Sequence, residues 1–234
     1  MKNWILVSAL ALLFASCTKE GREYSNPEER IIAVTGFKKI YSGGSFTVDI
    51  AKGNDFSVKA KGRPADLDDL TLTVTTGDIL NIEYDHYKPG RYRVDFTITL
   101  PMLTQVNLSG DAKGKVNGFA EQQTVLRTVV SGNGDLNLTG TAINLPVDLS
   151  GNAKLTVSGT TLSLYGNISG NAALHAYDVT ATEVDIEVSG NGHAYVFPQE
   201  SFFVDASGES RVYYKGNPSQ TNFITSGNGK IMRE

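Results

Sequence analysis

Residues 147–172 read VDLSGNAKLTVSGTTLSLYGNISGNA, and this stretch contains the repeat that decides the fold. A Ser-Gly pair begins at Ser150 and again at Ser169, and Asn follows it both times. The pair occurs seven times, with successive copies 22, 19, 19, 20, 18 and 19 residues apart, beginning at Ser109, Ser131, Ser150, Ser169, Ser189, Ser207 and Ser226. Regular self-similarity at such a period is typical of a solenoid built from stacked coils.

Apolar residues alternate with polar ones on both sides of each pair. Around Ser150 the apolar positions are Val147, Leu149, Leu155 and Val157. This period of two is typical of strands with one buried face. The third position after each serine is always small, namely Ala112, Gly134, Ala153, Ala172, Gly192, Ser210 and Gly229. We therefore expect a narrow corner of the interior there, at which glycine can adopt positive φ.

One coil of about 19 residues cannot bury its own apolar face, whereas stacked coils can. The pattern therefore predicts an all-β solenoid over residues 105–234. Residues 31–104 alternate in the same way with a looser period, as in Phe46, Val48 and Ile50. We interpret them as degenerate β coils or a small sheet that caps the stack, continuous with the repeats in one domain. The only helix expected in the body is a single turn near Asp66.

The N-terminus has the features of an export signal. Lys2 precedes the apolar run from Ile5 to Ala15, which is too short to span a bilayer as a helix. The following Phe14-Ala15-Ser16-Cys17 resembles a bacterial lipobox, which implies cleavage after residue 16 and lipid attachment at Cys17. The alternative is ordinary signal-peptide cleavage that leaves a free thiol. Residues 17–30 are polar and predict a flexible tether.

Several segments resemble one protein family. They are TLPMLTQVNLSGDAKGKV at 99–116, the SGN steps, SRVYYKGNP at 210–218 and SGNGKI at 226–231. These segments are similar to the head GIN domain, described as a putative autotransporter adhesin head and common in lipoproteins of Gram-negative bacteria. The resemblance covers roughly residues 37–231. It implies a right-handed parallel β-helix and an adhesin-like protein of the outer membrane, and it supplies no catalytic residues.

The most conspicuous candidate site is a ladder of asparagines that follow the Ser-Gly pairs: Asn133, Asn152, Asn171, Asn191 and Asn228. Their parity is opposite to that of the apolar positions, so they should point outward or into a turn. They could bind glycans, or they could stabilise the turns and hydrogen-bond to one another along the axis. The second interpretation is favoured.

Two further sets of residues are candidates for binding. A loose basic column lies four residues after the serines, at Lys113, Lys154, His193, Arg211 and Lys230, and is interrupted by Asp135 and Ala173. It could contact an acidic polysaccharide or simply be a solvated edge. Aromatic residues of the last coils, Phe197, Phe202, Phe203, Tyr213, Tyr214 and Phe223, could stack on sugars or close the core. Phe202, Tyr214 and Phe223 have inward parity, which favours the core.

Enzymatic chemistry is a weaker hypothesis. Asp185 and Glu187 share a strand face, and Asp148 lies close to two coils earlier, so a polysaccharide lyase or hydrolase is the alternative to a binding module. A purely structural spacer is a third possibility. The three histidines have no ligand-like spacing, so no metal or other cofactor is expected. A net charge of −4 without a basic block argues against nucleic acid. The expected partners are the membrane, through Cys17, and a glycan or another envelope protein.

Overall fold

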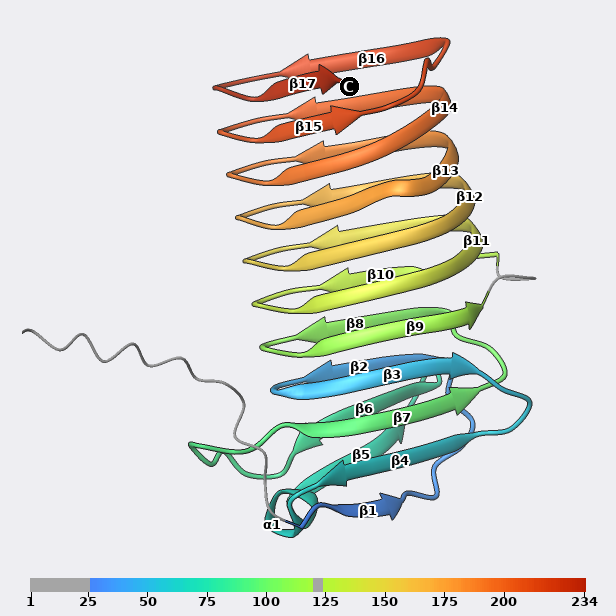
Figure 1. Ribbon diagram of the computed structural model, residues 1–234, viewed down its shortest axis with the longest axis vertical. Coiled ribbons are helices and arrows are strands. Elements are labelled where there is room, and N and C mark those ends of the chain that lie inside the picture. Colours follow the sequence, from blue (N-terminus) through green and yellow to red (C-terminus); the bar gives the residue numbers. More distant parts are fainter. Residues whose placement is uncertain (1–25, 120–123) are drawn as a thin grey trace, which may run out of the picture.

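The computed structural model describes residues 26–119 and 124–234 and is nearly all β, with 64% strand and 2% helix. It is a rod made of a β-solenoid of about 6 turns, whose coils are about 20 residues apart (Figure 1). The predicted fold class is therefore confirmed. The predicted signal peptide, 1–16, and Cys17 lie outside the described residues.

The regular coils start at β8 (Gln105–Ser109) and β9 (Lys113–Phe119). They continue through β10 (Arg127–Val130), β11 (Asp135–Leu149), β12 (Lys154–Ile168), β13 (Ala173–Val188), β14 (His193–Ala206), β15 (Arg211–Tyr214), β16 (Gln220–Thr225) and β17 (Lys230–Arg233). Neighbouring strands are parallel, and equivalent residues of successive repeats are paired, as Leu136 with Leu155 and Leu155 with Leu174. Each coil thus repeats the hydrogen-bonding pattern of the coil below it.

The Ser-Gly steps stack directly on one another. All seven step glycines have a positive φ between 63° and 75°. The amide of Asn152 donates to the carbonyl of Gly132 at 2.7 Å, and the amide of Asn171 donates to Gly151 at 2.7 Å. A Cβ on Gly151 would lie 2.8 Å from the Gly132 oxygen. Glycine is needed at the step because both the conformation and the close approach of the backbones exclude a side chain.

The interior of the rod is filled by the inward-facing residues predicted from the alternation. Val147, Leu155 and Leu174 are each 0% exposed, and so are the small corner residues Ala112 and Ala172. The core is one continuous cluster that extends from Phe37 to Val212. Apolar burial along the whole axis is therefore what holds the stacked coils together.

The N-terminal region combines coils with an antiparallel cap. Its elements are β1 (Glu28–Ile31), β2 (Lys39–Gly43), β3 (Phe46–Lys52), β4 (Ser57–Gly62), α1 (Pro64–Leu67), β5 (Leu70–Thr75), β6 (Ile79–Tyr84) and β7 (Val94–Leu100). Strands β2 and β3 form a coil between β6–β7 on one side and β8–β9 on the other. The order of the coils along the axis therefore differs from their order in the sequence (Figure 1).

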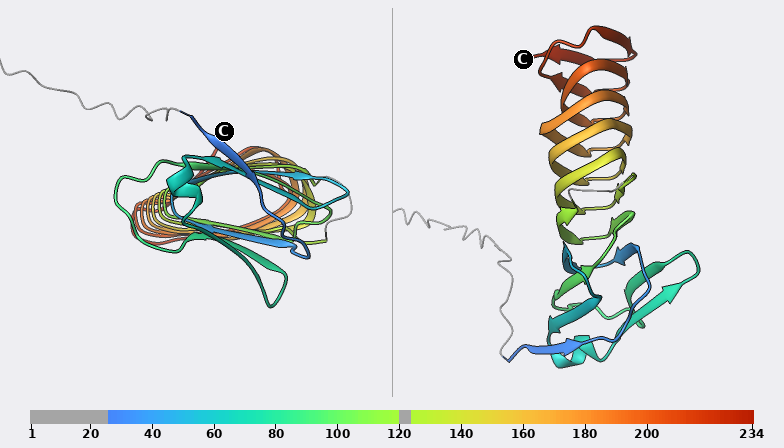
Figure 2. Two further views of the ribbon diagram at one scale, coloured as in Figure 1. Left: turned by 90° about the horizontal axis from the view of Figure 1, so that it is seen from below. Right: turned by 90° about the vertical axis from the view of Figure 1, so that its right-hand side faces the viewer.

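Antiparallel strands close this end of the rod. Strand β4 pairs antiparallel with β7 and with β1, and β5 pairs antiparallel with β6 in a hairpin that projects from the side (Figure 2). Both interpretations of residues 31–104, degenerate coils and a small capping sheet, are thus partly realised. The folded body begins earlier than composition suggested, because β1 includes Glu28–Arg30 of the predicted tether.

Candidate functional site

The asparagine ladder is hydrogen-bonded along the axis of the rod. The Nδ2 of Asn152 donates to the Oδ1 of Asn133 at 3.0 Å, and Asn171 and Asn191 each donate to the previous asparagine at 3.0 Å. This series of side-chain hydrogen bonds ends at Asp111, whose carboxylate accepts from the Nδ2 of Asn133 at 2.8 Å. Asn228 donates in the same way to the carboxylate of Glu209.

The direction of these bonds explains the two departures from Asn. Each asparagine donates toward the N-terminal end, so the residue that ends a run needs only to accept. A carboxylate accepts and does not donate, which suits Asp111 and Glu209 to that position. The ladder consequently consists of two runs whose amides mainly contact each other, as in the stacking interpretation of these residues.

A second candidate lies on the outer face of the strands that follow the steps. We define the aromatic–basic face as His175, Tyr177, His193, Tyr195, Arg211, Tyr213 and Lys215. The pairing of β12 to β15 and β17 aligns Lys154, Ala173, His193, Arg211 and Lys230 in one row, and aligns Thr156, His175, Tyr195, Tyr213 and Met232 in the next. The predicted basic column is therefore a real row, and an aromatic row lies beside it.

The rings of the aromatic row stack on one another. His175 and Tyr195 are 4.9 Å apart and Tyr195 and Tyr213 are 5.1 Å apart, both with an interplanar angle of 6°. Since the ring faces contact each other, the row presents ring edges and hydroxyl groups to solvent. Burial and the neighbouring charge of Lys154 lower the pKa of His175, which favours the uncharged imidazole.

Tyr177 extends across this row toward the C-terminal coil. Its ring is perpendicular to that of Tyr195, at 82°, and lies 4.2 Å from the Nζ of Lys215. Its hydroxyl donates to Glu234 at 2.9 Å. Burial and this hydrogen bond raise the pKa of Tyr177. The Nδ1 of His193 is buried and lacks a hydrogen-bond partner within the described residues. The aromatic–basic face therefore combines aromatic rings that are fixed by contacts with one another, cationic side chains, and an imidazole nitrogen that has no hydrogen-bond partner in the described residues.

The acidic candidates lie on the other face of the coil and do not converge. Asp148 is aligned with Asn167 and then Glu187, whereas Asp185 is aligned with Tyr165 and Phe203. Asp148 is bonded to Arg127 and accepts from Asn167 at 3.2 Å. Asp185 and Glu187 are exposed. Asp148 therefore shares a row with Glu187 and not with Asp185, and this row lies on an open face of the sheet.

The aromatic residues with inward parity form the end of the core, as predicted. Phe202 is 0% exposed and its ring lies 5.0 Å from that of Tyr214 and 5.2 Å from that of Phe223. Phe203 and Tyr213, by contrast, are outward on opposite faces of the coil. The six aromatics thus belong to different environments and do not form one platform.

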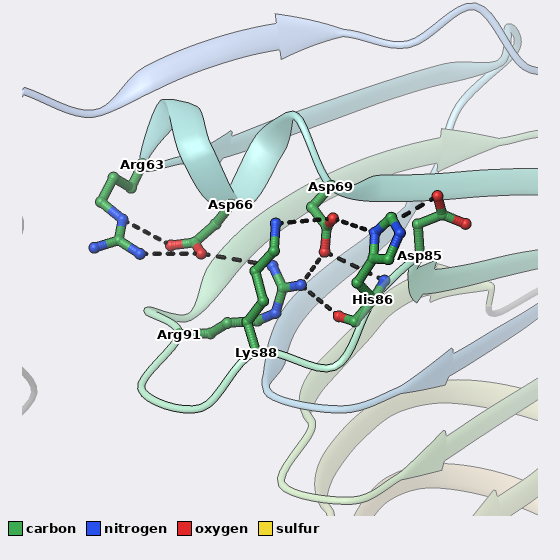
Figure 3. A network of polar contacts seen from close by, with 7 residues as sticks. All are labelled: Arg63, Asp66, Asp69, Asp85, His86, Lys88 and Arg91. Carbon is green, nitrogen blue, oxygen red and sulfur yellow. Dashed lines mark hydrogen bonds and ion pairs between the residues drawn. The ribbon is translucent and has the colours of Figure 1, made fainter.

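Sequence reasoning missed a buried charge network in the cap (Figure 3). It joins α1 to the loop that precedes β7. Asp66 accepts from Arg63 at 3.1 and 3.2 Å, and its side chain is 2% exposed. Asp69 accepts from Lys88 at 3.0 Å, from His86 at 2.8 Å and from Arg91.

Arg91 is the centre of this network. Its guanidinium lies 3.8 Å from the centre of the Tyr84 ring and donates to the His86 carbonyl at 2.5 Å. Burial would raise the pKa of Asp69, but the hydrogen bonds from Lys88, His86 and Arg91 outweigh it and hold this pKa well below its usual range. The stabilisation is therefore present above the ordinary pKa of an aspartate and is lost as the pH falls below it.

The network serves to fasten the cap. Each buried carboxylate is paired with an arginine, so neither is available as a base or a ligand. In residues 26–119 and 124–234 no group of three or more His, Cys, Asp or Glu could hold a metal ion. Nor does this part of the chain contain a helix of the length and apolar character needed to cross a bilayer.

Comparison with known families identifies the fold type. Residues 36–218 match the sequence profile of the family described as "Putative auto-transporter adhesin, head GIN domain". The chain belongs to this family. The family resemblance seen in the SGN steps is thereby confirmed. No curated protein sequence is significantly similar to the chain.

Several solved structures share the architecture of this chain. A "putative adhesin" from Bacteroides fragilis NCTC 9343 has a TM-score of 0.84 at 19% identity, covering 90% of this chain and 98% of that one. A "putative adhesin" and a "putative lipid binding protein", both from Parabacteroides distasonis ATCC 8503, have TM-scores of 0.68 and 0.64 at 18% and 19% identity. Each covers 89% of this chain and 97% of its own. At these identities the likeness establishes the fold alone.

Membership of the head GIN family points to the cell envelope or surface as the location and to an adhesin-like role. The family match includes the Ser-Gly steps from Ser109 to Ser207 and the whole aromatic–basic face, and it ends before β16.

Proposed function

We propose that this head GIN protein is a non-catalytic adhesin-like module, attached to the outer membrane by a lipid on Cys17, that binds an anionic glycan. The observation that carries the proposal is the aromatic–basic face. It is an open face on which hydroxyl, imidazole and cationic groups repeat from coil to coil.

The chemistry of this face favours an extended polyanionic ligand. Arg211 and Lys215 provide charge, and Lys154 and Lys230 continue the basic row on either side. Tyr195 and Tyr213 present hydroxyl groups, because stacking leaves their edges outward. Carboxylate or sulfate groups of a polysaccharide accept from such donors, and guanidinium–carboxylate pairs are the stronger kind of hydrogen bond.

Binding should be measured with the chain from residue 17 onward carrying Cys17→Ser, which contains the whole described fold. We expect it to retain acidic polysaccharides on a glycan array. Arg211→Ala and Tyr195→Phe should each weaken binding, the first by about tenfold or more, because a hydrogen bond to a charged group is worth roughly 1.5–3 kcal/mol. Added salt should weaken it further.

The matched controls are Asp185→Ala and Phe203→Ala on the other face, which should leave binding unchanged. An array with no reproducible ligand would favour a structural spacer and contradict the proposal. Turnover of a glycan that is abolished by Asp185→Ala or Glu187→Ala would replace the binding module with an enzyme.

The lipid anchor has a separate test. Cys17→Ser in the full-length chain should abolish acyl labelling and move the protein from the membrane fraction to the soluble fraction, because Cys17 supplies the only thiol. Unchanged labelling and fractionation in the variant would show that the protein is held at the envelope by some other means.

A further inference from the structure

The two ends of the rod differ in how they are finished. At the N-terminal end, antiparallel β1 and β4, helix α1 and the β5–β6 hairpin interrupt the stacking lattice (Figures 1 and 2). At the C-terminal end the last coil, formed by β16 and β17, pairs only with β14 and β15 beneath it. Within the described residues, nothing covers its upper edge.

The upper edge of the last coil has free backbone groups. In lower coils the carbonyls of Leu149, Gly151 and Ala153 accept from the coil above at 2.9, 2.7 and 2.8 Å. The equivalent residues of the last coil are Thr225, Gly227 and Gly229, and no backbone hydrogen bond to their carbonyls is found among the described residues. Unpaired strand edges of this kind readily add another strand.

The core is also open at this edge. Phe223 is aligned with Val204, which is 3% exposed, and its ring contacts Phe202, yet Phe223 is 40% exposed. Ile224 beside it is 52% exposed, but it is aligned with Asp205 and belongs to the outward row of the strand. Strand β16, which reads QTNFIT, contains no charge or proline. This strand therefore lacks the residues with which proteins usually protect an edge from pairing, whereas β17, which reads KIMR, carries Lys230 and Arg233.

We propose that two copies of this chain dock through these last coils, end to end. A copy of the same edge supplies what the open coil lacks, namely unpaired N–H and C=O groups and an apolar cross-section of the same shape. The contact would be isologous, with a two-fold axis perpendicular to the rod. Each edge strand would then pair antiparallel with the same strand of the other copy. Head-to-tail stacking would bring the open coil of one copy against the antiparallel cap of the next, which does not present the same strand edges.

The arrangement has a consequence that rests on the proposed anchor. The described chain begins at residue 26 beside the cap, at the opposite end of the rod from β16 (Figure 1). In an end-to-end pair the two β1 strands lie at the far ends. Lipid-anchored copies would therefore meet from opposing membranes, and the contact would join two cell surfaces.

Docking should be tested first in solution, where neither lipid nor glycan is needed. Sedimentation of the residue 17–234 chain with Cys17→Ser should show a concentration-dependent dimer. Ile224→Lys and Thr225→Pro should each abolish it, because lysine and proline on an edge strand both oppose pairing with another strand. Leu162→Lys is the matched control, because Leu162 is 58% exposed on a central coil and should leave the dimer intact.

The second measurement uses the native Cys17 thiol. Vesicles that carry the residue 17–234 chain through a maleimide lipid should cluster, and Ile224→Lys should prevent clustering while circular dichroism shows an unchanged fold. Monomers in solution without clustering, or a dimer insensitive to both edge variants, would overturn the proposal. A dimer without clustering would contradict contact between opposing membranes. A failed glycan array would leave these results unaffected.

Discussion

Replacing Gly159 with alanine should prevent the central coils from stacking. Gly159 has a φ of +132°, and a Cβ there would lie 1.8 Å from the carbonyl oxygen of Gly140 in the coil below. The added Cβ would collide with a backbone oxygen, which cannot move aside as the end of a side chain can. The two coils would therefore have to separate. We expect Gly159→Ala to lower the free energy of unfolding by more than about 4 kcal/mol, which is exceptional for one substitution.

The loss should be visible as insoluble expression or as a thermal transition far below that of the wild type. Because each coil contacts only its neighbours, separation at this level also weakens the burial of the coils on both sides. Gly36→Ala is the matched control. Gly36 has a φ of +80° with nothing within 4 Å, so its substitution tests the backbone strain alone, at about 1–2 kcal/mol. Equal effects of the two substitutions would refute the close-contact explanation.

The stacking of adjacent repeats also explains why the regular coils could be predicted from the sequence. The steps from Ser109 to Ser226 could be aligned because adjacent repeats are adjacent in space, so that a period in the chain is also a period in the rod. The alternation around each step assigned inward and outward positions for the same reason. The basic row through His193 and Arg211 followed from that alignment, and the row of His175, Tyr195 and Tyr213 is visible in it two residues further on.

The order in which the N-terminal strands stack along the rod could not be predicted from the sequence in this way. Ile40 pairs with Val106 although 65 residues separate them, and the coil of β2 and β3 is inserted between coils formed later in the chain. Alternation shows that a strand has a buried face but does not show which strand lies beside it. The antiparallel pairing of β1 with β4 was equally hidden, since β4 alternates like a strand of a coil and β1 is polar like the predicted tether.

The cap network was missed because its charges look like surface residues in the sequence. Asp66 and Asp69 are in a polar stretch and Arg91 is 22 residues beyond Asp69, with no spacing that suggests contact. Burial is what makes them important, and it depends on how α1 packs on β4 and the following loop. The hint that the sequence offers is that Asp66 and Asp69 lie in and just after a one-turn helix, while Lys88 and Arg91 lie in a later loop.

Arg91→Ala should therefore loosen the whole cap. The guanidinium of Arg91 is 9% exposed, lies over Tyr84 and contacts both buried aspartates. Without it, Asp69 keeps only Lys88 and His86 as side-chain partners, and burying a poorly paired charge is costly. We expect amide hydrogen exchange in α1, β4 and residues 85–93 to become faster by about tenfold or more, with little change in the central coils.

Lys88→Ala provides the matched control for this prediction. Lys88 donates to the same carboxylate, but its side chain is 53% exposed and water can take its place. Its removal should leave exchange in the cap nearly unchanged. If both variants had the same effect, burial of Arg91 would not be what fastens the cap. If Arg91→Ala also accelerated exchange in β12 and β13, the cap and the solenoid would unfold as one cooperative unit instead of as separate ones, contrary to the nearest-neighbour stability expected of stacked coils.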